Sequence, residues 1–157
     1  TTGLVLQTDT RVKAGIMIAA PPESVLLGGV TLASIRQPGL FFEALEDNSI
    51  TVLGNAYIEA NYDDYPVSAR LIQVADAGHW SFTDIAGLGN FGPGCGRAQR
   101  MTNPFASVTY LDNEVARTLT KSYVTAFFAK HLLADPAADA VLSKATPANV
   151  VTITHHD

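Results

Sequence analysis

Cysteine and charge are both scarce in this chain. Its 157 residues include one cysteine, Cys95, and only 16% charged residues against 47% hydrophobic ones. One cysteine excludes an internal disulfide and any cysteine-based metal cluster within the chain. A composition this apolar argues against intrinsic disorder, and the low charge fits a domain that buries one flank against a partner.

Basic clusters and long apolar runs are missing as well. The net charge is −5, the pI is near 5.2, and the ten Lys and Arg residues form no patch. We therefore expect no nucleic acid as a partner, and no apolar stretch is long enough to span a membrane. The length fits one domain over residues 1–157. Few lysines and the acidic pI favour a secreted or periplasmic protein, and the compartment stays open.

Motifs for cofactors and metals are also absent. Gly28 and Gly29 belong to no G-x-G-x-x-G or Walker pattern. Asp63 and Asp64 have no further candidate ligands at metal spacing, so this acidic pair indicates solvated surface. We expect no cofactor and no metal.

The most informative stretch is residues 71–84, LIQVADAGHWSFTD. Its first five residues have strand character and run into a short loop, where Gly78 and His79 are followed by the bulky Trp80 and Phe82. Open α/β sheets place their reacting groups just beyond the carboxyl ends of strands. His79 is therefore a candidate catalytic base, although an isolated loop histidine covered by a tryptophan is the simpler interpretation.

A second stretch, residues 37–50, favours the catalytic interpretation. The apolar run that starts at Leu40 predicts a strand buried on both faces, and Glu46 and Asp47 follow where it ends. His79 lies 79 − 47 = 32 residues after Asp47, which is about one α/β repeat. Parallel strands would bring both side chains to one edge of the sheet. There a carboxylate can accept the Nδ1 proton of the histidine and stabilise the imidazolium.

This pairing resembles the C-terminal half of the α/β-hydrolase family, in particular cutinase-like and dienelactone-hydrolase-like esterases and lipases. The likeness covers residues 12–133 and depends on the strand ending in an acid, PGLFFEALED, followed by the strand ending in Gly-His. It implies that Asp47 is the triad acid and His79 the triad base of a serine hydrolase acting on carboxylic esters or related acyl groups. Glu46 is the alternative acid because strand boundaries slip by a residue or more, and Glu23 is another because some relatives carry the acid after an earlier strand.

The chain departs from that family in having no nucleophile elbow. No G-x-S-x-G occurs in it, nor an HGGG-like stretch that could supply oxyanion donors. The resemblance therefore implies the C-terminal part of a parallel α/β-hydrolase sheet with flanking helices. A second polypeptide, or a missing N-terminal half, would supply the serine and the oxyanion hole. The rival interpretations are a non-catalytic binding module of this fold and, less favoured, an amidohydrolase subunit that uses Thr1 as an N-terminal nucleophile.

The remaining elements are expected around this pair of strands. Residues 85–109 are rich in glycine and predict a long loop, either a lid with Phe91 and Phe105 lining a pocket or a surface excursion. The other expected elements are a buried strand over 12–20, helices over 50–65, 112–133 and 136–143, and an edge strand over 150–154.

Overall fold

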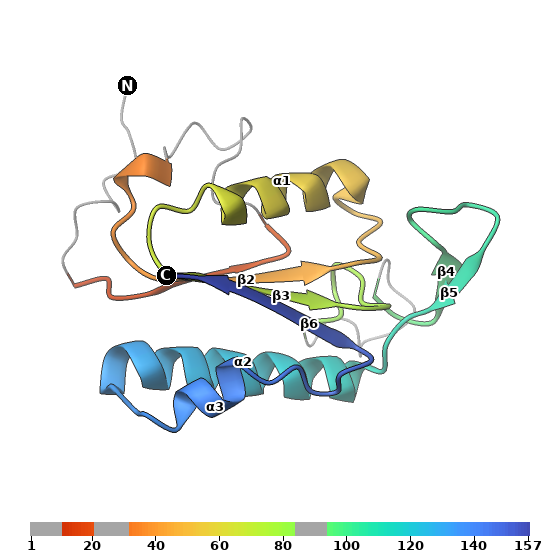
Figure 1. The fold of residues 1–157 in the computed structure, drawn as a ribbon. Coiled ribbons are helices and arrows are strands. Elements are labelled where there is room, and N and C mark those ends of the chain that lie inside the picture. Colours follow the sequence, from red (N-terminus) through yellow and green to blue (C-terminus); the bar gives the residue numbers. More distant parts are fainter. Residues whose placement is uncertain (1–10, 21–31, 84–93) are drawn as a thin grey trace.

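A computed structural model describes residues 11–20, 32–83 and 94–157, which form a mixed α/β domain (Figure 1). A four-stranded sheet in the order β1-β2-β3-β6 lies at its centre. The strands of this sheet are β1 (Gly15–Ile18), β2 (Gly39–Ala44), β3 (Ala69–Val74) and β6 (Val151–His156). The helices are a short 3-10 turn (Leu32–Ser34), α1 (Thr51–Asp63), α2 (Asn113–Leu133) and α3 (Ala138–Leu142).

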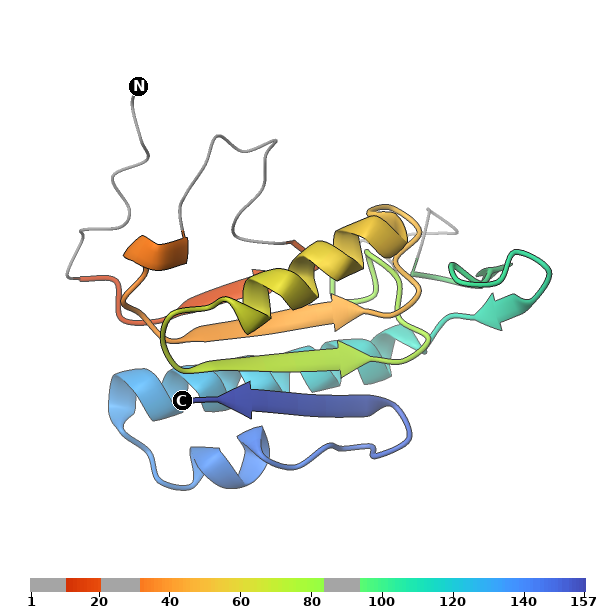
Figure 2. The same ribbon diagram turned by 45° about the horizontal axis from the view of Figure 1, so that its top comes forward.

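The sheet is mixed, which corrects the expectation of a parallel sheet. Strands β1, β2 and β3 run parallel, whereas β6 pairs with β3 in the antiparallel sense, with Val151 opposite Val74. The path of the chain explains this direction. Helix α2 leads away from the carboxyl end of β3, and α3 with residues 143–150 leads back to that end (Figure 2). The chain therefore enters β6 where β3 ends.

Adjacent residues of β2 anchor the helices on the two faces of the sheet. Helix α1 covers one face, and α2 with α3 covers the other (Figure 1). Because successive side chains of a strand point to opposite faces, Phe41 packs in the cluster beneath α1, with Tyr62 and Tyr65. Phe42 packs in the cluster beneath α2. All six residues of β2 are buried, as expected for a strand covered on both faces.

The long helix α2 confirms the helix that the sequence predicts over 112–133. The Asp112 side chain caps it by accepting hydrogen bonds from the backbone N–H groups of Glu114 and Val115. The helix ends at Ala134, which adopts a left-handed conformation with φ of 54°. Helices α1 and α3 lie within the ranges expected from the sequence, whereas strand β6 extends two residues beyond the expected 150–154, to His156.

Two expectations were wrong, one about the first strand and one about the glycine-rich stretch. Strand β1 is shorter than the expected 12–20 and only partly buried, with Ile18 38% exposed, because within the described residues it pairs with β2 alone. The glycine-rich stretch contains a hairpin of β4 (Arg97–Gln99) and β5 (Ser107–Thr109), seen at the right of Figure 1. Phe105, in the loop of that hairpin, is 99% exposed to solvent, whereas Phe91 lies outside the described residues. In the described part of the chain, no helix combines the length and apolar character needed to cross a membrane.

Tyr123 provides a test of how α2 is attached to the segment before β6. Its buried hydroxyl donates a hydrogen bond to the Lys144 carbonyl and accepts one from the Thr146 N–H. Tyr123→Phe should lower the free energy of unfolding by about 1–3 kcal/mol, because both backbone groups lose a partner. Urea denaturation measures the change. Tyr57→Phe, at a tyrosine that is 48% exposed, is the matched control and should change stability by less than about 0.5 kcal/mol. Equal effects of the two changes would contradict this account.

Candidate active site

The candidate site lies at the carboxyl ends of β2 and β3. These strands pair in register from Gly39 with Ala69 to Ala44 with Val74. The pairing continues beyond both strands, because the Leu45 N–H donates to the Val74 carbonyl. The Glu46 N–H then donates to the Ala77 carbonyl. The turn that carries Asp47 and the loop that carries His79 are therefore held side by side.

Asp47 is fully buried, and both of its carboxyl oxygens are occupied. One oxygen, Oδ1, accepts hydrogen bonds from the backbone N–H groups of Ser49 (3.0 Å) and Ile50 (3.2 Å). The other, Oδ2, lies 2.8 Å from His79 Nδ1. The first two contacts belong to the turn that leads into α1, so the start of that helix fixes the orientation of the carboxyl group.

The ring of His79 is oriented by Asp47 and flanked by Trp80. An ionised carboxylate can only accept hydrogen bonds, so Nδ1 of His79 carries the proton of this contact. In the neutral ring this leaves Nε2 as an acceptor. The Trp80 ring packs edge-on against the imidazole, with centroids 4.7 Å apart. The His79 side chain is 24% exposed, so the ring is supported on one side and remains accessible.

Ser81 stabilises the loop that presents His79. Its hydroxyl accepts a hydrogen bond from the Gly78 N–H and donates one to the Gly94 carbonyl. Gly94 is required at this contact, because its φ is 137° and a Cβ there would lie 2.7 Å from the backbone nitrogen of Ser81. Ser81 is fully buried and engaged in both contacts. It therefore has a structural role and is not a candidate nucleophile.

The structure separates Asp47 from the other candidate acids. The Glu46 carboxylate is also buried, but it accepts hydrogen bonds from the Arg100 guanidinium and from the Met101 N–H. It holds the β4–β5 hairpin against the end of β2, whereas Asp47 alone of these two acids contacts His79. Glu23 and Thr1, the alternatives from the sequence, lie outside the described residues.

The sequence did not indicate the partners of Glu46. Arg100 bridges Glu46 and Asp76, the latter at 3.1 Å, and so connects the hairpin to the loop after β3. Arg100 follows Glu46 by 54 residues in a stretch with no periodic pattern. Asp76 adopts a left-handed backbone conformation with φ of 53°. A short polar residue tolerates that conformation, but nothing in the local sequence requires it.

Glu43 is a buried acid that the sequence analysis did not single out. It lies within β2, and its Oε2 accepts a hydrogen bond of 2.9 Å from Gln73 Nε2 on the neighbouring strand. Burial raises the pKa of Glu43 to about 7, and the nearby Glu59 carboxylate adds to this rise. The carboxyl group therefore exchanges a proton near neutral pH.

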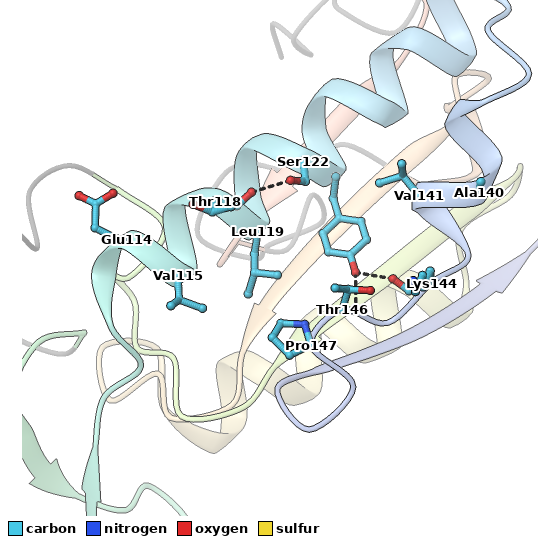
Figure 3. Close-up of a pocket in the computed structure, with 11 residues that line it drawn as sticks. Glu114, Val115, Thr118, Leu119, Ser122, Ala140, Val141, Lys144, Thr146 and Pro147 are labelled. Atoms are coloured by element: carbon cyan, nitrogen blue, oxygen red, sulfur yellow. Dashed lines mark hydrogen bonds between the residues drawn. The ribbon is translucent and has the colours of Figure 1, made fainter.

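A separate apolar hollow lies between α2, α3 and the segment before β6 (Figure 3). Its volume is about 640 Å³, and its lining includes Val115, Leu119 and Val141. Neither Asp47 nor His79 lines it. Within the described residues, no group of three or more His, Cys, Asp and Glu side chains is arranged to hold a metal ion.

In comparisons with known proteins, no family model and no curated protein matches this chain.

The contact between Arg100 and Glu46 gives a prediction about stability. Arg100→Ala leaves the buried Glu46 carboxylate with the Met101 N–H but no cation, so the free energy of unfolding should fall by about 1–3 kcal/mol. Chemical denaturation measures the change. Arg97→Ala, in the same hairpin at an exposed residue, should change stability by less than about 0.5 kcal/mol. An effect of Arg100→Ala no larger than this control would show that Glu46 needs no cation.

The buried Glu43 gives a prediction about pH. In the folded chain its pKa is near 7 instead of 4.5, so between these values the folded state retains a proton that the unfolded state has lost. Stability should therefore fall as pH rises through this window, by about 2–3 kcal/mol in total. Glu43→Gln should remove most of this decline, as measured by urea denaturation between pH 4.5 and 8. Parallel pH profiles for the two proteins would rule out Glu43 as the source.

Proposed function

We propose that this chain supplies the acid and the base of a Ser-His-Asp triad in a serine hydrolase of the α/β-hydrolase type. The substrate class is carboxylic esters or related acyl compounds. The observation that carries the proposal is the 2.8 Å contact between Asp47 Oδ2 and His79 Nδ1, made by a fully buried carboxyl group at the carboxyl ends of parallel strands. Catalytic triads need this orientation of the ring, with Nε2 left to face the nucleophile.

In this reaction, His79 Nε2 takes the proton of the serine hydroxyl as its oxygen attacks the acyl carbon. The same nitrogen then gives the proton to the leaving alcohol, and the acyl group stays on the serine. Water then attacks the acyl carbon and loses a proton to Nε2, which returns this proton to the serine oxygen as the bond to the acyl group breaks and the acid is released. Asp47 accepts the Nδ1–H throughout and stabilises the imidazolium. Within the described residues, the hydrogen bond with Asp47 is the only one made by the His79 ring.

The nucleophile comes from outside the described residues in this proposal. The chain contains no G-x-S-x-G elbow, and Ser81, which is close to His79 in sequence, is buried and hydrogen-bonded to Gly94. A second polypeptide that carries the serine and the oxyanion donors would complete the site. The partial exposure of His79 leaves room for such a contact.

Labelling with a serine-reactive fluorophosphonate tests this arrangement. The purified protein, with any co-purifying chain, is treated and read by intact mass. Label on a serine of a second chain supports the proposal. Label on Thr1 would replace it with an N-terminal nucleophile, and no label anywhere would favour a non-catalytic binding module.

His79→Ala should lower ester hydrolysis by about 10²–10⁴-fold or more, because the general base is lost. The free energy of unfolding should change by less than about 2 kcal/mol, since the ring makes one hydrogen bond and is partly exposed. Steady-state kinetics and urea denaturation measure the two effects. His155→Ala, at an exposed histidine of β6, is the matched control and should keep full activity. Near-full turnover by His79→Ala would rule out this catalytic role.

Asp47→Asn tests the acid while preserving the shape of the side chain. Its amide oxygen can still accept from Ser49 and Ile50, but its NH₂ group can face Nδ1 and favour the wrong tautomer of His79. We expect kcat to fall by about 10⁴-fold with a small change in KM. Glu46→Gln, at the neighbouring acid that binds Arg100, should retain far more activity. A larger loss of activity in Glu46→Gln than in Asp47→Asn would identify Glu46 as the triad acid.

A further inference from the structure

A second cavity lies on the α1 side of the sheet, between the end of β2, residues 52–59 of α1, the loop after β3 and the β4–β5 hairpin. Its volume is about 390 Å³. Four carboxyl groups line it, those of Glu43, Glu46, Glu59 and Asp76, together with one cation, Arg100. Neither Asp47 nor His79 is among the lining residues, so this cavity is a separate place from the proposed triad.

The charges of this cavity are not balanced. Arg100 binds Glu46 and Asp76. The other two carboxyl groups share one neutral donor, because Gln73 Nε2 donates to Glu43 Oε2 at 2.9 Å and to Glu59 Oε1 at 3.2 Å. The half of the cavity nearest β2 and α1 is therefore rich in acceptors, and no cation pairs with its two acids within the described residues.

Asn55 adds an acceptor without a partner to the same wall. It lines the cavity one helical turn before Glu59 and is 6% exposed. Its amide nitrogen donates to the Ala44 carbonyl at 2.9 Å, which fixes the orientation of the amide. Its Oδ1 is buried and has no hydrogen-bond partner within the described residues. Buried acceptors in native structures are usually paired, so an unpaired one on a residue that shares this lining with Glu43 and Glu59 indicates a missing donor.

The missing donor has the chemistry of an organic cation. A metal ion fits poorly, because no group of three or more His, Cys, Asp and Glu side chains in the described part of the chain is arranged to hold one. An ammonium or guanidinium group instead carries positive charge and several N–H donors, and the apolar side chains of Val52, Ala56 and Met101 on the same lining suit its alkyl chain.

We propose that the cavity formed by Glu43, Asn55 and Glu59 binds an alkylammonium or alkylguanidinium group, in which N–H donors meet both carboxylates and the Asn55 amide oxygen. A free small molecule and a Lys or Arg side chain of a protein partner present the same chemistry. The raised pKa of Glu43 agrees with this arrangement, because a buried acid without a cation nearby keeps its proton more strongly.

Binding is tested on the full chain by nuclear magnetic resonance of ¹⁵N-labelled protein at pH 8. The probes are n-butylguanidine, its uncharged analogue n-butylurea and a blocked Gly-Arg-Gly peptide. We expect n-butylguanidine to shift the side-chain amide signals of Asn55 and Gln73 in a saturable way, and n-butylurea to bind at least about tenfold more weakly. Tighter binding of the peptide would identify a basic side chain of a partner as the ligand, and tighter binding of n-butylguanidine would identify a small molecule.

Two variants on the same helix make the test specific. Glu59→Gln, at an exposed residue of the cavity, should weaken binding of n-butylguanidine at least about tenfold. Asp63→Asn, at an exposed acid of α1 that does not line the cavity, should leave the affinity unchanged. Equal losses in the two variants would reduce the effect to general electrostatic attraction and overturn the proposal. The absence of a saturable shift in the unmodified protein would overturn it as well.

Discussion

The arrangement of the candidate site depends on the two oxygens of one buried carboxyl group. Asp47 joins the end of β2 to the start of α1 through Ser49 and Ile50, and to the loop after β3 through His79. Each contact alone would be a common turn or a common ion pair. Together they fix a carboxyl group from both sides, which prevents its rotation and sets the plane of the imidazole. Such preorganisation is what a proton-transfer site requires, because the geometry is set before the substrate arrives.

A second network supports this one from the hairpin side. Glu46, next to Asp47 in the sequence, binds Arg100 and the Met101 N–H, and Arg100 also reaches Asp76 in the loop that leads to His79. The Asp47 turn and the His79 loop are thus attached to the same hairpin as well as to each other. Beneath them, Phe41 and Phe42 anchor α1 and α2 to opposite faces of the sheet. The site therefore lies on a packed platform, and the reacting partner must approach from its exposed edge.

Elements with a clear apolar period or a sharp stop were predictable from the sequence. Helix α2 lies within the expected 112–133, and strands β2 and β3 lie where the apolar runs were found. The exposure of β1 was not predictable, because it depends on which strands pair with it. The hairpin was missed for a different reason: its strands are only three residues long, which is too short for alternation to be recognised in the sequence. The direction of β6 followed from the return path through α3, which no local pattern records.

The sequence by itself determined the chemical types and their order: an acid after one buried strand, a histidine after the next, and about one α/β repeat between them. It also determined that neither cofactor motif nor nucleophile elbow is present in the chain. Only the tertiary structure decided which of two adjacent acids meets the histidine, and which holds the hairpin. The physical reason is distance along the chain. Local patterns report burial and backbone preference over a few residues, whereas the partners of Asp47 and Glu46 lie 32 and 54 residues away, and only folding brings them together.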